Sequence, residues 1–231
     1  MKDVIVALDF KDKETCLEFL DKFDESIFVK VGMELFYKEG PEIIKLIKER
    51  GHKIFLDLKL HDIPNTVGGA FRSLSSLNVE MLNLHIAGGS EMIKRAKEEL
   101  PNSTLLGVTM LTSIDEKTMH DEILINSRLS VEQVVLSYAR FGKESGLDGI
   151  VCSAQEVPKV KEELGPEFLT VTPGIRPQGE DTGDQKRVAT PEDARNLGSD
   201  YIVCGRPITR SEDPVSSYRK IREEFLGLWK K

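Results

Sequence analysis

A short stretch of acidic and basic residues interrupts an apolar segment in the first third of the chain. The sequence FLDLKLHDIPNTV, residues 55–67, places Asp57, Lys59 and Asp62 among residues that otherwise suit a buried β-strand. Such a cluster can perform general acid–base chemistry or stabilise charge that develops on a bound molecule. A buried ion-pair network that serves only the fold is the alternative. Because desolvating the ions makes such networks seldom net stabilising, we expect a functional site here.

The positions of these charges within the predicted strand indicate where they point. Side chains of a strand alternate between its two faces, so Asp57 and Lys59 share a face with Phe55, and the leucines occupy the other face. In a barrel the leucine face would pack against helices, which directs Asp57 and Lys59 inward near the carboxyl end of the strand. By the same alternation, Asp9 and Lys30 on two other predicted strands point to the same mouth.

Eight short apolar runs, rich in β-branched residues, alternate with segments of helical spacing. The runs expected as strands are residues 4–8, 27–31, 53–59, 81–85, 104–109, 149–153, 168–173 and 201–205. The segments with helical spacing include residues 13–23, 40–51, 90–100, 131–146 and 154–165. This alternation predicts an α/β protein, a (β/α)8 TIM barrel forming a single domain over residues 1–231. An open doubly wound sheet is the alternative, although no G-x-G-x-x-G motif follows the first run.

One predicted connection is longer than the others. Residues 174–189 follow the seventh predicted strand and are rich in Gly, Pro and charged residues. Loops of this length in a compact domain are usually lids or disordered segments, and barrels often bind phosphate after strands seven and eight. After the last strand, Gly205 would allow close backbone approach and Arg206 would offer a two-pronged clamp to phosphate. We expect a phosphate-gripping lid, with a surface insertion as the alternative.

The composition argues against several classes of protein. The 231 residues carry a formal net charge of −7, which argues against non-specific binding of nucleic acid. No apolar run reaches the length of a signal sequence or a membrane span, so we expect no membrane partner and a cytoplasmic location. Cys16, Cys152 and Cys204 lie far apart without metal-ligand spacing, so we expect neither a disulfide framework nor a metal site.

Six segments of the chain resemble the orotidine 5'-phosphate decarboxylase family. They are ALDF (7–10), KVGMELF (30–36), FLDLKLHDIPNTV (55–67), VTMLTS (108–113), VTPGIRPQGEDTGDQKRVATP (171–191) and IVCGRPIT (202–209). The resemblance covers essentially the whole chain. The D-x-K-x-x-D pattern also occurs in related barrel enzymes that act on sugar phosphates. Lys30 and the GIRP…DQKR segment, followed by CGRPI, are more specific to this family.

The resemblance implies a reaction and a role for each site residue. The implied activity is decarboxylation of orotidine 5'-monophosphate to uridine 5'-monophosphate in de novo pyrimidine biosynthesis, without a cofactor or metal. The implied catalytic residues are Lys59, Asp57, Asp62 and Lys30, with Lys59 as the proton donor. The implied substrate-binding residues are Asp9, Lys30, Asp57, Ile63, Thr66, Thr112, Ser113, Arg176, Gln185, Gly205 and Arg206.

Within that set, the resemblance divides the contacts by the part of the nucleotide. Asp9 and Lys30 would hold the ribose hydroxyls, and Thr112 and Ser113 would belong to the pyrimidine-binding loop. The implied phosphate contacts are Gln185, Gly205 and Arg206, with Arg176 as a further position in the lid. The family resemblance also implies a homodimer, in which Asp62, Ile63 and Thr66 reach the site of the other subunit.

The residue types fit this reaction on independent grounds. Loss of carbon dioxide leaves negative charge on a ring carbon, and the ammonium of Lys59 could stabilise that charge and then protonate the carbon. A Schiff-base aldolase is a second possibility, but it needs a neutral amine, whereas Asp57 and Asp62 favour the ammonium form. A metal-dependent sugar-phosphate decarboxylase and a phosphate-ligand-binding barrel without turnover would also fit a barrel with these charged residues.

Overall fold

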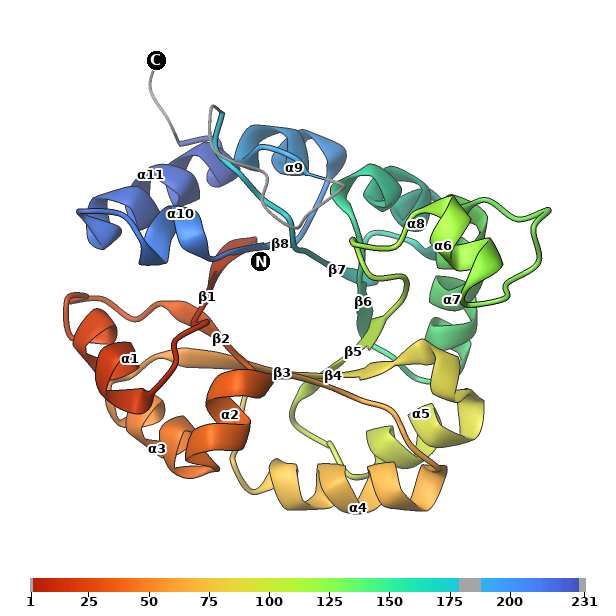
Figure 1. The fold of residues 1–231 in the computed structure, drawn as a ribbon, viewed down its shortest axis with the longest axis horizontal. Helices are drawn as coiled ribbons and strands as arrows, with labels where there is room; N and C mark the ends of the chain where they lie inside the picture. The colour runs from red at the N-terminus through yellow and green to blue at the C-terminus, as the bar shows by residue number, and fades with distance from the viewer. Residues whose placement is uncertain (1, 179–187, 229–231) are drawn as a thin grey trace.

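The chain folds as a closed parallel barrel with helices outside it. The computed structural model describes residues 2–178 and 188–228. The strands are β1 (Asp3–Ala7), β2 (Phe28–Gly32), β3 (Lys53–Leu60), β4 (Met81–His85), β5 (Thr104–Val108), β6 (Gly149–Val151), β7 (Leu169–Thr172) and β8 (Tyr201–Cys204). Each strand pairs in parallel with its neighbour in sequence, and β1 pairs with β8 to close the ring (Figure 1). The predicted single-domain (β/α)8 barrel is confirmed, and the open sheet is excluded.

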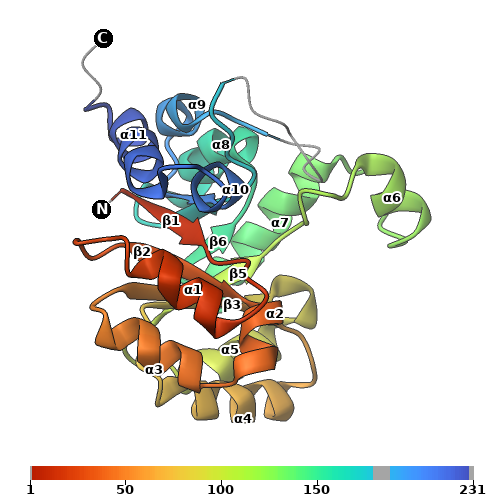
Figure 2. The same ribbon diagram turned by 60° about the vertical axis from the view of Figure 1, so that its left-hand side comes forward.

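The helices surround the barrel and connect successive strands. They are α1 (Lys13–Leu20), α2 (Met33–Glu39), α3 (Glu42–Glu49), α4 (Pro64–Ser75), α5 (Ser90–Glu98), α6 (Glu116–Asp121), α7 (Val131–Glu144), α8 (Val157–Leu164), α9 (Pro191–Leu197), α10 (Arg206–Thr209) and α11 (Pro214–Leu226). Short 3₁₀ helices η1 (Ile86–Gly88) and η2 (Ala154–Glu156) precede α5 and α8. Figure 2 shows α6 extending away from the body of the barrel.

The helical segments expected from the sequence are present, but several are shorter than their spacing indicated. The segment expected at 154–165 forms η2 first, and α8 begins only at Val157. Pro158 explains this start, because proline lacks an amide hydrogen and fits only the first turn of an α-helix. The segment expected at 40–51 is separated from α2 by Gly40, which adopts a φ of +66° and ends that helix.

Each strand sends its apolar side chains to one of two separate clusters. The inner cluster fills the barrel interior and consists of Ile5, Ala7, Phe28, Phe55, Met81, Leu106, Val171 and Val203. The outer cluster packs the strands against the helices and includes Ile54, Leu56 and Leu58 of β3. Phe55 therefore points inward and its neighbours Ile54 and Leu56 point outward, as the alternation predicted. The inner cluster forms the floor on which the polar residues of the mouth lie.

The strand β3 is interrupted close to its carboxyl end. Its pairing with β4 joins Leu56 to Leu82 and then Leu60 to Leu84, so the register shifts between Leu56 and Leu60. Within this bulge Lys59 has a φ of +51°, a left-handed conformation that is uncommon for residues other than glycine. The bulge was not predicted from the sequence, and it changes the direction of the chain where the charged residues lie.

The long connection after β7 begins and ends at one point of the barrel. Ile175 and Ala189 form an isolated parallel bridge, in which the amide of Arg176 donates to the carbonyl of Ala189 at 3.0 Å. The amide of Ala189 donates in turn to the carbonyl of Gly174 at 3.3 Å. These bonds hold the two ends of the segment 174–189 together. Among the described residues, no helix has the length and apolar character needed to cross a bilayer.

Candidate active site

A pocket of about 620 Å³ opens at the carboxyl ends of the strands. The position matches the mouth at which active sites of such barrels lie. Nine residues named from the sequence line it, namely Asp9, Lys30, Asp57, Lys59, Thr112, Ser113, Arg176, Gly205 and Arg206. They come from β2, β3 and from the segments after β1, β5, β7 and β8. The fold thus brings together residues that are separated by up to 197 positions in sequence.

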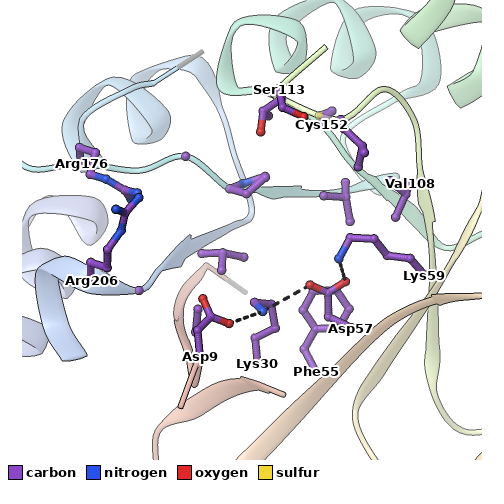
Figure 3. Close-up of a pocket in the computed structure, with 18 of the residues that line it drawn as sticks. Asp9, Lys30, Phe55, Asp57, Lys59, Val108, Ser113, Cys152, Arg176 and Arg206 are labelled. Atoms are coloured by element: carbon purple, nitrogen blue, oxygen red, sulfur yellow. Dashed lines mark hydrogen bonds and ion pairs between the residues drawn. The ribbon is translucent and has the colours of Figure 1, made fainter. Parts of the chain in front are cut away.

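Four charged side chains form a row of alternating sign along one wall of the pocket (Figure 3). The ammonium of Lys30 lies 3.2 Å from Asp9 Oδ1 and 3.5 Å from Asp57 Oδ2. The ammonium of Lys59 donates to the other oxygen of Asp57, Oδ1, at 2.7 Å. The Asp57 carboxylate therefore lies between two cations, one on each oxygen. This row supports the inward direction predicted for Asp57 and Lys59.

The charged states of the row support one another. Burial by itself would raise the pKa of Asp57, but the ammonium charges of Lys30 and Lys59 and hydrogen bonds from Lys59 and Asn83 hold that pKa below its ordinary value. Burial opposes the charge of Lys30, yet the carboxylates of Asp57 and Asp9 raise its pKa above the ordinary range. Asp57 is thus held as a carboxylate and Lys30 as an ammonium near neutral pH.

Two glycines leave the space that the row of charges requires. A Cβ atom at Gly32 would lie 3.1 Å from the Lys30 ammonium nitrogen, so a side chain there would displace it. A Cβ atom at Gly205 would lie 3.3 Å from Ala7 Cβ and 3.8 Å from Asp9 Oδ2. Gly205 therefore lets the chain after β8 pass close to the end of β1. The predicted close approach of the Gly205 backbone to a phosphate stays a prediction.

Two arginines lie together on the side of the pocket away from Lys59. Figure 3 shows Arg176, at the start of the long connection, and Arg206, at the start of α10, with their guanidinium groups pointing toward one another. Two adjacent guanidinium groups attract a dianion such as a phosphate and can donate several hydrogen bonds to it. Thr112 and Ser113, in the segment after β5, line the same pocket. The pocket thus has one cationic end and one wall of mixed charge.

Three of the described residues named from the sequence do not line this pocket in the single chain. Asp62, Ile63 and Thr66 follow β3 and are exposed to solvent, and the Ile63 side chain is 67% exposed. The remaining residue, Gln185, lies outside the described residues. The pocket therefore holds Asp57 and Lys59, the first two charged residues of the D-x-K-x-x-D pattern. The last residue of that pattern, Asp62, is exposed to solvent instead.

Polar or nucleophilic residues near the site that were not predicted from the sequence include Cys152, Thr209, Arg210 and Asn83. Cys152 lines the pocket at the end of β6. Asn83 of β4 is only 1% exposed, and its amide nitrogen donates to Asp57 Oδ1 at 2.6 Å. The alternation that singled out Asp57 could have found Asn83, because it is an inward polar residue between Leu82 and Leu84 in an apolar strand. Asn83 was not predicted because the sequence analysis singled out charged residues, and its side chain is neutral.

Comparisons with known proteins agree with the fold. The sequence model of the "Orotidine 5'-phosphate decarboxylase / HUMPS family" matches residues 2–221. A curated relative from Staphylococcus saprophyticus, named orotidine 5'-phosphate decarboxylase, is 57% identical over 227 residues, which is 96% of this chain and 98% of the relative.

Solved structures give the same result. The orotidine 5'-phosphate decarboxylase of Lactobacillus acidophilus matches with a TM-score of 0.87 at 45% identity, covering 97% of this chain and 99% of the other. The enzyme of that name from Pyrococcus horikoshii has a TM-score of 0.78 at 23% identity over 97% and 99% of the two chains, a likeness in fold. On these matches together, the chain belongs to the orotidine 5'-phosphate decarboxylase / HUMPS family.

Proposed function

We propose that this chain decarboxylates orotidine 5'-monophosphate to uridine 5'-monophosphate in de novo pyrimidine biosynthesis, without a cofactor. Membership of the family and the names of its relatives support this reaction. The observation that carries it is the row Asp9–Lys30–Asp57–Lys59 facing a pocket whose other end holds Arg176 and Arg206. That arrangement suits a substrate with a phosphate at one end and a reacting carboxylate at the other.

In the proposed reaction Lys59 meets the charge that forms on the pyrimidine ring. The bond between the ring carbon and its carboxylate breaks, carbon dioxide departs, and the electron pair stays on the carbon. The Lys59 ammonium stabilises that pair and then transfers a proton to it, which forms a C–H bond and leaves a neutral amine. Solvent returns the proton to Lys59 after the product leaves. The pairing of Lys59 with Asp57 at 2.7 Å supports this role, because it holds the ammonium in one place.

Repulsion between Asp57 and the reacting carboxylate is a smaller contribution. Two like charges about 4 Å apart repel by roughly 4 kcal/mol at an effective dielectric near 20, whereas enzymes lower barriers by about 8–23 kcal/mol. The remainder is assigned to stabilisation of the carbanion by Lys59 and to binding of the phosphate and ribose. These contacts hold the ring beside Lys59, so binding energy at a distance contributes to the rate.

The substrate contacts are proposed by the same division of the pocket. Arg176, Gly205 and Arg206 would bind the phosphate, together with Gln185 of the lid at about 174–189. The ribose hydroxyls would meet Asp9 and Lys30. Thr112 and Ser113 would contact the pyrimidine. The bridge between Ile175 and Ala189 joins the two ends of the lid. This supports a lid that covers the phosphate while its two ends stay in place on the barrel.

A homodimer completes the proposed site. The exposure of Asp62, Ile63 and Thr66 in the single chain supports their contribution to the pocket of a second copy. Asp62 would then join Lys30, Asp57 and Lys59 as the fourth charged catalytic residue. A cytoplasmic location stays a prediction, which cell fractionation would test.

The direct test is to mix the purified protein with orotidine 5'-monophosphate in the presence of chelator and follow the loss of substrate absorbance. Turnover is expected in chelator, whereas a metal-dependent decarboxylase would be inactive. Nucleotide binding without turnover would instead favour the non-catalytic barrel. Trapping of a borohydride-reduced adduct on Lys59 would favour the aldolase.

The variant Lys59→Ala tests the role of the lysine. We expect turnover to fall by roughly 100-fold or more, because both charge stabilisation and proton donation are removed. Lys53→Ala is the matched control, since Lys53 is an exposed lysine at the opposite end of the same strand. Retention of more than a few per cent of turnover in Lys59→Ala, with normal activity in the control, would reject the role proposed for Lys59.

A further inference from the structure

Asn83 is a buried polar residue that connects two parts of the site without lining the pocket itself. It lies in the middle of β4, where its neighbours Met81 and Leu82 belong to the inner and outer apolar clusters. Its side chain is 1% exposed. Burying an amide is costly unless its donor and acceptor are both satisfied. The partners of Asn83 therefore indicate why an amide is placed here.

The backbone opposite Asn83 is irregular. Leu56 pairs with Leu82 and Leu60 pairs with Leu84, so three residues of β3, Asp57 to Lys59, lie opposite the single residue Asn83. Lys59 adopts a φ of +51° within this bulge. A left-handed conformation is unfavourable for a residue other than glycine and persists only where its surroundings hold it. Something near Lys59 must therefore stabilise this conformation.

The Asn83 amide contacts both the backbone and the partner of Lys59. Its oxygen Oδ1 accepts the backbone N–H of Lys59 at 2.8 Å, and its nitrogen Nδ2 donates to Asp57 Oδ1 at 2.6 Å. The same Asp57 oxygen accepts the Lys59 ammonium at 2.7 Å. The orientation of the amide is set by chemistry, because a backbone N–H can only donate and a carboxylate can only accept.

We propose that Asn83 is a positioning residue that fixes the Lys59 ammonium by holding its backbone and its carboxylate partner at once. These two hydrogen bonds of Asn83, to the Lys59 backbone and to Asp57, are called the Asn83 clamp here. The clamp stabilises the left-handed conformation at Lys59 and orients one Asp57 oxygen to Lys59, which leaves the other oxygen for Lys30. Its consequence for catalysis rests on the decarboxylase function proposed above. The clamp itself is a property of the folded chain.

Two substitutions separate the halves of the clamp. Asn83→Leu keeps a similar size and removes both hydrogen bonds, so kcat is expected to fall about 100-fold, the cost of a displacement near 1 Å. The KM for the nucleotide should change far less, because the phosphate contacts at Arg176 and Arg206 are untouched. Asn83→Asp keeps the acceptor for the Lys59 N–H but replaces the donor to Asp57 with a second carboxyl group.

The Asn83→Asp variant should also acquire a new dependence on pH. Its carboxyl would lie against Asp57, with Lys59 on the adjacent strand β3, Lys30 on β2, and His85 and His61 near the mouth. Two adjacent carboxyls share one proton, and the pKa at which that proton leaves is raised. While it is protonated, the carboxyl introduced at position 83 can still donate to Asp57, so kcat should be highest at low pH and fall as pH rises through that pKa. The same amide-to-acid change at exposed Asn102 should introduce no such decline.

A readout that does not depend on turnover tests the clamp directly. Hydrogen exchange at the Lys59 amide should be slow in the wild type and in Asn83→Asp, and at least about tenfold faster in Asn83→Leu, because the acceptor is gone. If the wild type fails to decarboxylate the nucleotide, the proposed function falls and hydrogen exchange alone decides the clamp.

Three results would overturn the inference while leaving the proposed function intact. One is an Asn83→Leu enzyme whose kcat stays within about threefold of wild type. Another is an unchanged rate of exchange at the Lys59 amide in that variant. The third is an Asn83→Asp enzyme with the pH dependence of the wild type.

Discussion

Asp57 is the residue at which the interactions of the site converge. Its carboxylate accepts hydrogen bonds from Lys59 and Asn83 on one oxygen and faces Lys30 with the other. Only 7% of the residue is exposed, so these partners rather than solvent keep it charged. A carboxylate held in this way can fix two ammonium groups at a set spacing, and it does so without being consumed in the proposed reaction.

The two arginines lead to a prediction for a single side chain. Arg206→Ala should weaken activity on orotidine 5'-monophosphate by at least about 10-fold, because one good charge-assisted contact to phosphate is lost. Activity on the unphosphorylated nucleoside should change little. The measurement is kcat/KM on both substrates. Arg140→Ala serves as the control, since Arg140 pairs with Glu163 on an exposed helical surface. Equal losses on both substrates would mean that Arg206 does not bind the phosphate.

At the level of strands and helices, charged residues at the amino ends of the strands, opposite the pocket, help to hold neighbouring strands together. Glu80, Asp148 and Asp200 each immediately precede an even-numbered strand. Their carboxylates accept the amide of the second residue in the preceding strand, at 2.6 Å from Ile54, 2.7 Å from Leu105 and 2.8 Å from Thr170. The same device therefore recurs at β3, β5 and β7. Charge at the amino ends of the strands serves stability, whereas charge at the carboxyl ends forms the site.

Removal of one of these carboxylates should destabilise the fold without affecting turnover. In Asp200→Ala the buried amide and hydroxyl of Thr170 and the ammonium of Lys161 lose their common partner. We expect the free energy of unfolding to fall by about 2–3 kcal/mol, measured by urea denaturation, with kcat unchanged. Asp21→Ala, which removes an exposed pairing with Arg50, should have a much smaller effect. A loss of kcat in Asp200→Ala at temperatures where it is folded would contradict this separation of roles.

In the molecule as a whole, one chain supplies most of the site. The four-charge row and the arginine pair come from a single barrel, but Asp62, Ile63 and Thr66 lie outside its pocket. A twofold dimer would place these residues of each copy against the pocket of the other. The proposed active unit is therefore two chains with two equivalent sites.

Mixing two inactive variants tests that arrangement. Lys59→Ala and Asp62→Ala should each have little activity alone. When the two are unfolded, mixed in equal amounts and refolded together, half of the dimers combine one chain of each. Each mixed dimer then holds one site with Lys59 from one chain and Asp62 from the other, so about a quarter of all sites are restored. Activity that does not rise above the unmixed samples would place Asp62 outside the catalytic site of the partner.

The barrel and most of the site could be predicted from the order of residues along the chain. Alternation of apolar runs with helical segments predicted the order of strands, and the two-residue period directed Asp57 and Lys59 inward. Both patterns are local, because a side chain's face follows from its position in its own strand. The family resemblance added Thr112, Ser113 and Arg176, which no local pattern marks. The main catalytic candidates were predicted because they are charged, and the neutral Asn83 was therefore missed.

The contacts between these residues depend on how the strands pack. The register of β3 against β4 sets three residues opposite Asn83, and neither strand carries that information in its own sequence. The meeting of Arg176 and Arg206 at one pocket depends on the pairing of β7 with β8, whose residues are distant along the chain. Hydrogen bonds require agreement within a few tenths of an ångström, and that agreement is a property of packed elements. The sequence specified which groups reach the mouth, and the packing of the strands fixed which atoms touch there.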